Sequence, residues 1–359
     1  MGFYLCPMQV DYLIIGQGIC GTMLSWFLHK EGKSFLVIDD GNEHSSSKVA
    51  AGLINPVTGR RYVYTWMIDQ VMPFAVDTYQ QMGEHLHSHF VFKKSIIDLF
   101  PSAQMREAFA TRVTEDDTYL HAFPDQNKFN QYFHFDFGCG EISPAYLVNV
   151  QILLASWRKH LLDNNVLLQE NFNLKELYVE NDHVSYQNII AQKIIFCDGI
   201  QSFHNPWFNL LPFSPNKGEA LIIESEGLTN EYLFKKGVIL APLPVQNTFW
   251  VGSNYQWEFE NDQPSEAFYN QTVAHLKAWL KVPFKVLFHK AAVRPATVER
   301  RPFVGFHPKN NNIGILNGMG TKGTSLAPFF ANQMVQQLLY GFPLMEEANI
   351  SRFARILTK

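Results

Sequence analysis

Short apolar runs alternate with turn residues near the start of the chain, and this pattern predicts a strand, a helix and a second strand. Residues 12–15 form a continuous apolar run that is typical of a buried strand. A helix is predicted next, because apolar side chains such as Met23 and Phe27 recur at helical spacing. Gly32 breaks this helix, and residues 35–38 form the second apolar run. Two strands joined through a helix are expected to pair in parallel.

A longer helix is predicted in the middle of the chain. Ser143 and Pro144 are residue types favoured at the N-cap and in the first helical turn. Apolar runs at residues 166–168 and 193–197 are predicted strands, and the second is expected to return the chain to the parallel sheet. The apolar positions that indicate the helix are Leu147, Val150, Leu154, Trp157 and Leu161.

The pattern becomes β-rich between residues 221 and 260. Strands are predicted over residues 237–243 and 248–257, interrupted by prolines and glycines. A final helix is predicted over residues 326–340, ending at Gly341. The expected fold class is α/β, or α+β overall: a Rossmann-type domain with a parallel sheet, and a second, mostly antiparallel β domain.

Composition limits the classes of function. A chain of 359 residues exceeds the usual size of one hydrophobic core, so two domains are expected. The formal net charge of −4 offers no basic footprint for nucleic acid. No apolar run is long enough to span a membrane. The cysteines lack a short-spaced pair, which predicts reduced thiols and a cytoplasmic location; they are Cys6, Cys20, Cys139 and Cys197.

A glycine pattern occupies the turn after the first strand. Gly16 would allow a tight turn, Gly18 the close approach of a pyrophosphate, and Gly21 close packing of helix on strand. The amides at the start of the helix, from Ile19 onward, would bind phosphate without a basic side chain. A glycine-rich turn with no ligand is the alternative, but the strand before it and the helix after it favour a dinucleotide.

Two further features extend this predicted site. Asp39 ends the second strand, eighteen residues after Gly21, where a carboxylate accepts a hydrogen bond from a ribose hydroxyl, and Asp40 adjoins it. The next loop carries hydroxyls and small side chains that let the backbone approach a planar ring. Its candidate cofactor contacts are Ser46, Ser47, Ala50, Ala51, Gly52 and Leu53.

Three later stretches, at residues 196–199, 291–295 and 317–328, complete an ordered set of motifs. With the glycine turn and the small-residue loop, this set resembles the superfamily of D-amino-acid oxidase, glycine oxidase and sarcosine oxidase. The resemblance implies a flavoprotein that holds FAD, with the Arg-Pro element and the glycine-rich turn beside the isoalloxazine. The later cofactor contacts that it implies are Asp198, Gly199, Gly320, Thr321, Gly323 and Thr324.

The resemblance also implies how a substrate is held. Arg294 would bind the substrate carboxylate, a task that suits a planar guanidinium. Lys322 would be a second cation, and Arg61 is a weaker substrate-binding candidate. Independently of the resemblance, Tyr255 is a weak candidate, because it is the polar member of an aromatic stretch over residues 250–259 that could line a cavity or build a core. Ala292 occupies the approximate position of the cysteine that tethers flavin in sarcosine oxidases, so FAD is expected to be bound non-covalently.

The function implied by the resemblance is FAD-dependent oxidation of the C–N bond of a small amine or amino acid, of the glycine, sarcosine or D-amino-acid kind. A hydride would pass to the flavin, and dioxygen or another compound would accept the electrons. Two alternatives stay open: a relative of the tRNA-uridine-modifying FAD oxidoreductases, which the acidic chain disfavours, and a non-catalytic flavin-binding protein.

The expected domains are discontinuous. Residues 1–90, 141–215 and 290–359 would form the FAD-binding domain, and residues 91–140 and 216–289 the substrate-binding domain. No metal is expected. His85, His87 and His89 would share one face of a strand, but no carboxylate partner is apparent, and a solvated segment is the favoured interpretation.

Overall fold

The computed structural model describes residues 7–359, so Cys6 lies outside the described part of the chain. One of its two large sheets has a parallel centre. The strand order there is β19-β12-β1-β2-β9. These strands are β1 (Met8–Ile15), β2 (Phe35–Ile38), β9 (Leu167–Leu168), β12 (Ile189–Phe196) and β19 (Asn310–Asn317).

The register of β1 confirms the predicted strand–helix–strand unit. Tyr12 pairs in parallel with Phe35 on one side and with Lys193 on the other. Leu13 packs into the core on one face of the sheet, and Ile14 packs into the core on the opposite face. Because both faces are buried there, residues 12–15 of the strand are apolar at every position instead of alternating.

Helices cover this sheet, and three short strands extend it with antiparallel pairing: β10 (Leu177–Val179), β11 (Val184–Tyr186) and β18 (Phe303–His307). Helix α1 packs against α7, and α7 in turn packs against α3. The helices are α1 (Ile19–Lys30), α2 (Ser46–Val49), α3 (Ile68–His85), α4 (Ala103–Glu115), α5 (Val150–Asp163), α6 (Glu266–Trp279), α7 (Gly323–Tyr340) and α8 (Ala354–Leu357).

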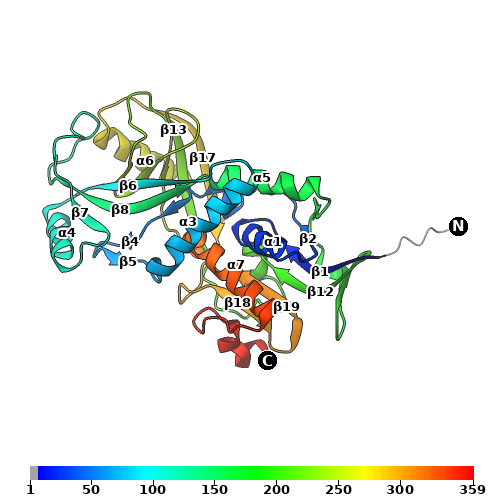
Figure 1. The fold of residues 1–359 in the computed structure, drawn as a ribbon. Helices are drawn as coiled ribbons and strands as arrows, with labels where there is room; N and C mark the ends of the chain where they lie inside the picture. The colour runs from blue at the N-terminus through cyan, green and yellow to red at the C-terminus, as the bar shows by residue number, and fades with distance from the viewer. Residues whose placement is uncertain (1–6) are drawn as a thin grey trace.

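The second sheet has nine strands, and all its pairings are antiparallel except β14 with β6. Figure 1 shows it as a separate lobe at upper left, with β1 and β12 of the parallel sheet at lower right. In order, the strands are β17 (Lys285–Arg294), β13 (Asn216–Glu224), β16 (Thr248–Gly252), β15 (Val238–Pro242), β14 (Leu233–Lys236), β6 (Val91–Leu99), β8 (Cys139–Val148) and β3 (Leu53–Ile54), with β7 (Leu120–Ala122) beside β8.

The predicted helix start at Ser143 and Pro144 is wrong, because both residues belong to strand β8. They lie where the register against β6 shifts between Lys94 and Ile96. At such an irregularity a proline interrupts no ladder hydrogen bond. The helix itself exists, but it begins at Val150.

The predicted strand over residues 248–257 is also too long. Strand β16 ends at Gly252, and Tyr255 and Trp257 beyond it are exposed, whereas Trp250 is buried. The final helix begins at Gly323 and ends at Tyr340. The predicted domain boundaries stay a prediction; the antiparallel sheet takes β3 from a segment that was assigned to the FAD-binding domain.

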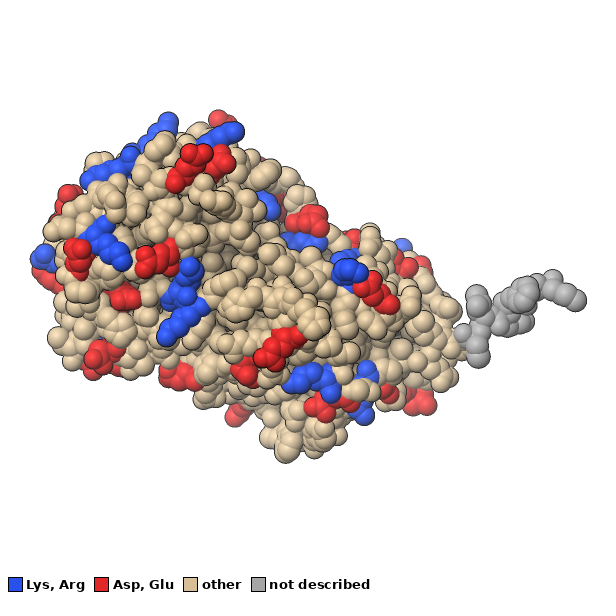
Figure 2. Space-filling view, turned by 45° about the horizontal axis from the view of Figure 1, so that its top comes forward, with Lys and Arg blue, Asp and Glu red and all other residues tan. Residues whose placement is uncertain are grey.

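Charged side chains of both signs are mixed on the face seen in Figure 2, with no area of a single sign. This mixture fits the nearly balanced totals of 29 Lys and Arg against 33 Asp and Glu. Within residues 7–359, no helix is both long and apolar enough to cross a bilayer.

Candidate active site

A cavity of about 770 Å³ is lined by residues from both sheets. The ends of β1, β2 and β12 contribute to it, as do β13, β16 and β17 from the antiparallel sheet and the start of α7. Of all the site residues predicted from the sequence, only Gly21 and Arg61 do not line it. The fold therefore brings together motifs that are spread from position 16 to position 324.

The glycine turn lies where strand β1 meets helix α1. Gly16 has a φ of +95°, and a Cβ there would lie 2.7 Å from the carbonyl oxygen of Cys197. A Cβ on Gly21 would lie 1.9 Å from the carbonyl oxygen of Gly16, so Gly21 permits close packing and does not itself reach the cavity. Gly18 is the N-cap of α1 and provides no capping side chain. The amides that follow Ile19 in the first turn are thus available to an anion, whereas the amide of Ile19 itself donates to Ser47.

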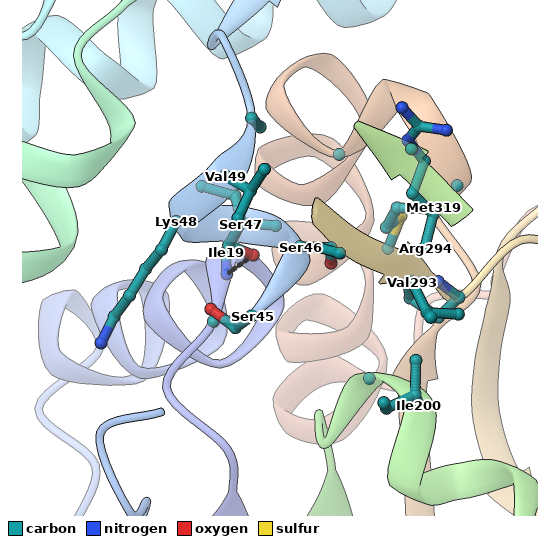
Figure 3. A pocket seen from close by; sticks show the side chains of 18 of the residues that line it. Ile19, Ser45, Ser46, Ser47, Lys48, Val49, Ile200, Val293, Arg294 and Met319 are labelled. Carbon is teal, nitrogen blue, oxygen red and sulfur yellow. Dashed lines mark hydrogen bonds between the residues drawn. The ribbon is translucent and has the colours of Figure 1, made fainter. Parts of the chain in front are cut away.

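The loop after β2 faces this helix start. The hydroxyl of Ser47 accepts a hydrogen bond from the amide of Ile19 over 3.0 Å, as Figure 3 shows. Trp250 of the antiparallel sheet donates its indole N–H to the carbonyl of Val49 over 2.9 Å. The short helix α2 is therefore hydrogen-bonded both to α1 and to β16 of the antiparallel sheet.

Lys48 lies on the same helix but is directed elsewhere. In Figure 3 it points away from Arg294, and its ammonium pairs with Glu43.

Asp39 is held by a network that sequence patterns did not reveal. Its carboxylate accepts hydrogen bonds from the amides of Gln17 and Gly41, over 2.7 and 2.8 Å. The guanidinium of Arg158, on α5, pairs with the same carboxylate at 2.6 Å. The pair is largely buried, since the Asp39 and Arg158 side chains are 18% and 15% exposed. Asp39 thereby enters the cavity wall with its charge compensated and its orientation fixed.

These features fit FAD. The cavity offers uncapped helix amides at one end, a carboxylate at the end of β2, and small residues along the loop over residues 50–52.

The two thiols in the wall, Cys20 and Cys197, are buried, and burial raises the pKa of Cys20 to about 12. A thiol with so high a pKa is a poor nucleophile.

A partly buried carboxyl, that of Asp198, also lies in the wall, just after β12. Asp198 accepts a hydrogen bond from the hydroxyl of Ser202, and burial raises the pKa of Asp198 to about 7. The amide of Asn317 donates to the same hydroxyl and to the carbonyl of Gly199. This network fixes the turn that brings Asp198 and Gly199 to the cavity.

Arg294 ends strand β17 and is the main cation of the cavity wall. Its guanidinium donates to the Asn216 side-chain oxygen over 2.6 Å, to the Ser253 hydroxyl over 2.7 Å and to the Asn254 carbonyl over 3.3 Å. All three acceptors are neutral. No carboxylate among residues 7–359 forms an ion pair with it. The geometry leaves a fixed positive charge that is oriented but not neutralised.

Space for this guanidinium depends on a glycine in the neighbouring strand. A Cβ on Gly218 would lie 1.7 Å from a terminal nitrogen of Arg294. Glycine inside a strand often marks such a close approach, so Gly218 was a usable sequence signal. Tyr255 covers the guanidinium with its ring, 5.1 Å from ring centre to the guanidinium carbon. In Figure 3, Arg294 and Met319 lie across from the segment that carries Ser46 and Ser47.

Lys322 also reaches the cavity, from the turn before α7. Its ammonium makes one long hydrogen bond, 3.4 Å to the hydroxyl of Thr65, and burial lowers the pKa of Lys322 to about 8. Arg61 is exposed in the loop between β4 (Val57–Thr58) and β5 (Val63–Tyr64) and does not join the cavity. The structure thus brings Lys322 to the same cavity as Arg294 and leaves Arg61 outside it.

Fold and cavity together define a dinucleotide-binding protein with an appended antiparallel sheet. Residues 11–337 match the family model described as DAO, FAD dependent oxidoreductase. The chain therefore belongs to this family, and the predictions of an oxidoreductase and of FAD as its cofactor are confirmed.

Three solved structures illustrate the shared fold. Glycine oxidase from Geobacillus kaustophilus has a TM-score of 0.79 at 13% identity, with 97% of this chain and 98% of that chain covered. Iminodiacetate oxidase from Chelativorans sp. BNC1 has a TM-score of 0.76 at 16% identity, with 96% and 98% covered. L-proline dehydrogenase from P. horikoshii has a TM-score of 0.72 at 15% identity, with 97% and 99% covered. The likeness extends over at least 96% of this chain and confirms the predicted fold class.

The ion pair under Asp39 gives a first prediction. Replacing Arg158 with Leu leaves a half-buried carboxylate without its charged partner, which destabilises the site by about 1–3 kcal/mol. We expect the R158L protein to retain less FAD after dialysis and to unfold at a lower temperature. Flavin absorbance per chain and thermal unfolding measure both effects.

Lys159 provides the matched control, because its ion pair with Asp163 is exposed. The K159L protein should keep its FAD and its unfolding temperature, since exposed pairs contribute little. Equal behaviour of the two variants would contradict the role given to Arg158.

Proposed function

We propose that this protein oxidises the C–N bond of a small amine that carries a carboxylate, such as an amino acid. The observation that supports this most directly is Arg294, a half-buried guanidinium in the cavity wall that only neutral acceptors hold. An unpaired cation in such a place favours an anionic ligand, and its planar fork suits a carboxylate. The names of the similar structures, which include a glycine oxidase and an iminodiacetate oxidase, agree with this substrate class.

In this proposal Arg294 anchors the carboxylate and Lys322 adds a second positive charge. Side chains such as Trp250, Val293 and Met319 line the same cavity and help to exclude water. FAD, when bound, would supply the redox chemistry as the acceptor of a hydride. The chain would then need no side-chain base at the carbon next to nitrogen, because that hydrogen would leave with its electron pair.

Non-covalent FAD is part of the proposal. Ala292 lines the cavity and has no nucleophilic group, and the nearby thiols of Cys20 and Cys197 are buried. Dioxygen or another compound would accept the electrons. The scattered cysteines are the basis for the expected cytoplasmic location, which stays a prediction.

The two alternatives are less well supported. A tRNA-modifying role needs a basic surface for the phosphate backbone, whereas the chain has a net charge of −4 and mixed charges on the face in Figure 2. A non-catalytic flavin-binding role gives no reason for a half-buried cation, Arg294, without an anionic partner in the cavity wall.

An anaerobic spectral titration tests the proposed activity. The purified protein should contain FAD, and its visible flavin absorption should bleach with one or more of glycine, sarcosine, proline, iminodiacetate and D-amino acids. Each substrate is compared with its amide, which carries no negative charge. Bleaching by the amides as well as by the acids would contradict carboxylate recognition.

The Arg294→Met protein makes the test specific to the residue. It should bind FAD but lose about 10- to 100-fold in kcat/KM for the acid, as expected when a charge-assisted pair is lost. Arg61→Met is the control, because Arg61 is exposed and outside the cavity. Unchanged kinetics in the Arg294 variant would remove its proposed role.

Lys322 predicts a pH dependence. Burial lowers its pKa from 10.5 to about 8, so its side chain is charged below pH 8 and neutral above it. If the charged form attracts the substrate, wild-type kcat/KM should exceed that of Lys322→Met by on the order of tenfold below pH 8. Above that pH the two values should converge, and the ratio cancels any ionisation of the substrate.

Lys322→Arg is the control for charge. An arginine stays protonated across this range, so the ratio of its kcat/KM to that of wild type should rise above pH 8. A wild-type to methionine ratio that does not change with pH would contradict the role of the lysine charge.

A further inference from the structure

Three histidines from three different helices meet at the surface, remote in sequence from one another. They are His29 on α1, His85 on α3 and His160 on α5. Their ring centres form a nearly equilateral triangle with sides of 5.1, 5.2 and 5.0 Å. One nitrogen of each ring lies within 4.8 Å of the other two. None of the three lines the cofactor cavity.

We propose that His29, His85 and His160 form a binding site for a divalent transition-metal ion of the zinc or copper class. Imidazole nitrogen is the preferred ligand of these ions. In a tetrahedral site with bonds of 2.0–2.1 Å, ligand nitrogens lie about 3.4 Å apart. The rings are therefore within on the order of 1 Å of a binding arrangement, which small side-chain rotations supply.

The rings are also free to bind. Within residues 7–359, no ring nitrogen of these three histidines takes part in any of the hydrogen bonds, which elsewhere engage the rings of His121, His183, His275 and His307. Burial, and then the neighbouring His85, lower the pKa of His29; burial is also the main cause of the lowered pKa of His160. Neutral imidazoles present the lone pair that a metal needs.

The position on the helices favours a cation for a second reason. Each histidine lies in the last turn of its helix. The C-terminal turns of three helices therefore lie near one place, and each helix end carries a partial negative charge. A bound ion would be stabilised by this field and would join the ends of α1, α3 and α5.

Two tryptophans report on the site. The ring of Trp157 stacks on that of His160 at 4.6 Å, and the ring of Trp26 lies 5.4 Å from that of His85. Copper(II) quenches nearby indole fluorescence, so two of the seven tryptophans should respond to it. With three protein ligands, the remaining coordination position would be open to water or a small anion.

The sequence alone did not predict this cluster. The spacing of His85, His87 and His89 allowed a shared face on a strand, but His85 ends helix α3 and His87 follows in the left-handed conformation with a φ of +52°. The partners of His85 come instead from helices that begin more than forty residues away on either side.

Titration of the FAD-loaded, untagged protein with ZnCl2 in a calorimeter tests the proposal. We expect saturation near one Zn²⁺ per chain and a rise in unfolding temperature of at least about 2 °C with excess ion. CuCl2 should quench part of the tryptophan fluorescence with the same stoichiometry. His29→Gln, His85→Gln and His160→Gln should each weaken binding by at least about tenfold.

His87→Asn is the matched control, since His87 is exposed, close in sequence and outside the cluster, and asparagine tolerates its backbone conformation. It should bind zinc like the wild type. Flavin content, measured for every variant, verifies that each protein is folded. Absence of saturable binding near one equivalent, or binding that His85→Gln leaves intact, would overturn the proposal.

Discussion

The charge on Arg294 is the constraint on which the proposed chemistry depends. A guanidinium in a cavity wall is costly to desolvate, and this one gains hydrogen bonds from Asn216, Ser253 and Asn254 but no countercharge. Neutral acceptors orient a cation and leave its field intact. An anionic ligand would supply the missing charge, so binding and orientation of a carboxylate follow from the same residue. Gly218 is part of this arrangement, because any side chain there would occupy the space of the guanidinium.

At the other end of the cavity, beside the start of α1, backbone amides and not side chains provide the positive charge for the cofactor phosphates. The start of α1 offers amides to the phosphates, and the absence of side chains at Gly16 and Gly21 lets strand and helix approach closely enough to form the turn. Asp39 sits beside this positive helix end, and its charge is balanced by Arg158. One cavity can thus accept a phosphate-bearing cofactor at one end and an anionic substrate at the other, with separate sources of positive charge.

Elements with a simple local cause were predictable from the sequence. The strand over residues 35–38 was found at its observed bounds, because a strand buried on both faces is apolar at each position. The predicted helix start at Ser143 and Pro144 was wrong because the same residue types suit a helix start and an irregular strand position. Only the register of β8 against β6 decides between the two. Motifs identified site residues that line the cavity, all but Gly21 and Arg61 among those predicted. They did not identify Arg158, which pairs with Asp39, or Asn216, which accepts a hydrogen bond from Arg294. Their roles arise from which strands and helices become neighbours, and no local pattern encodes that.

The most direct test of the central claim uses a ligand that cannot react. Acetate and acetamide have nearly the same shape and differ in charge, and binding of either beside the flavin would perturb its visible absorption spectrum. The account predicts a saturable perturbation by acetate, little or none by acetamide, and loss of the acetate effect in the Arg294→Met protein. Equal perturbation by both compounds, or an acetate effect that survives the substitution, would contradict the claim that Arg294 holds a carboxylate in this cavity.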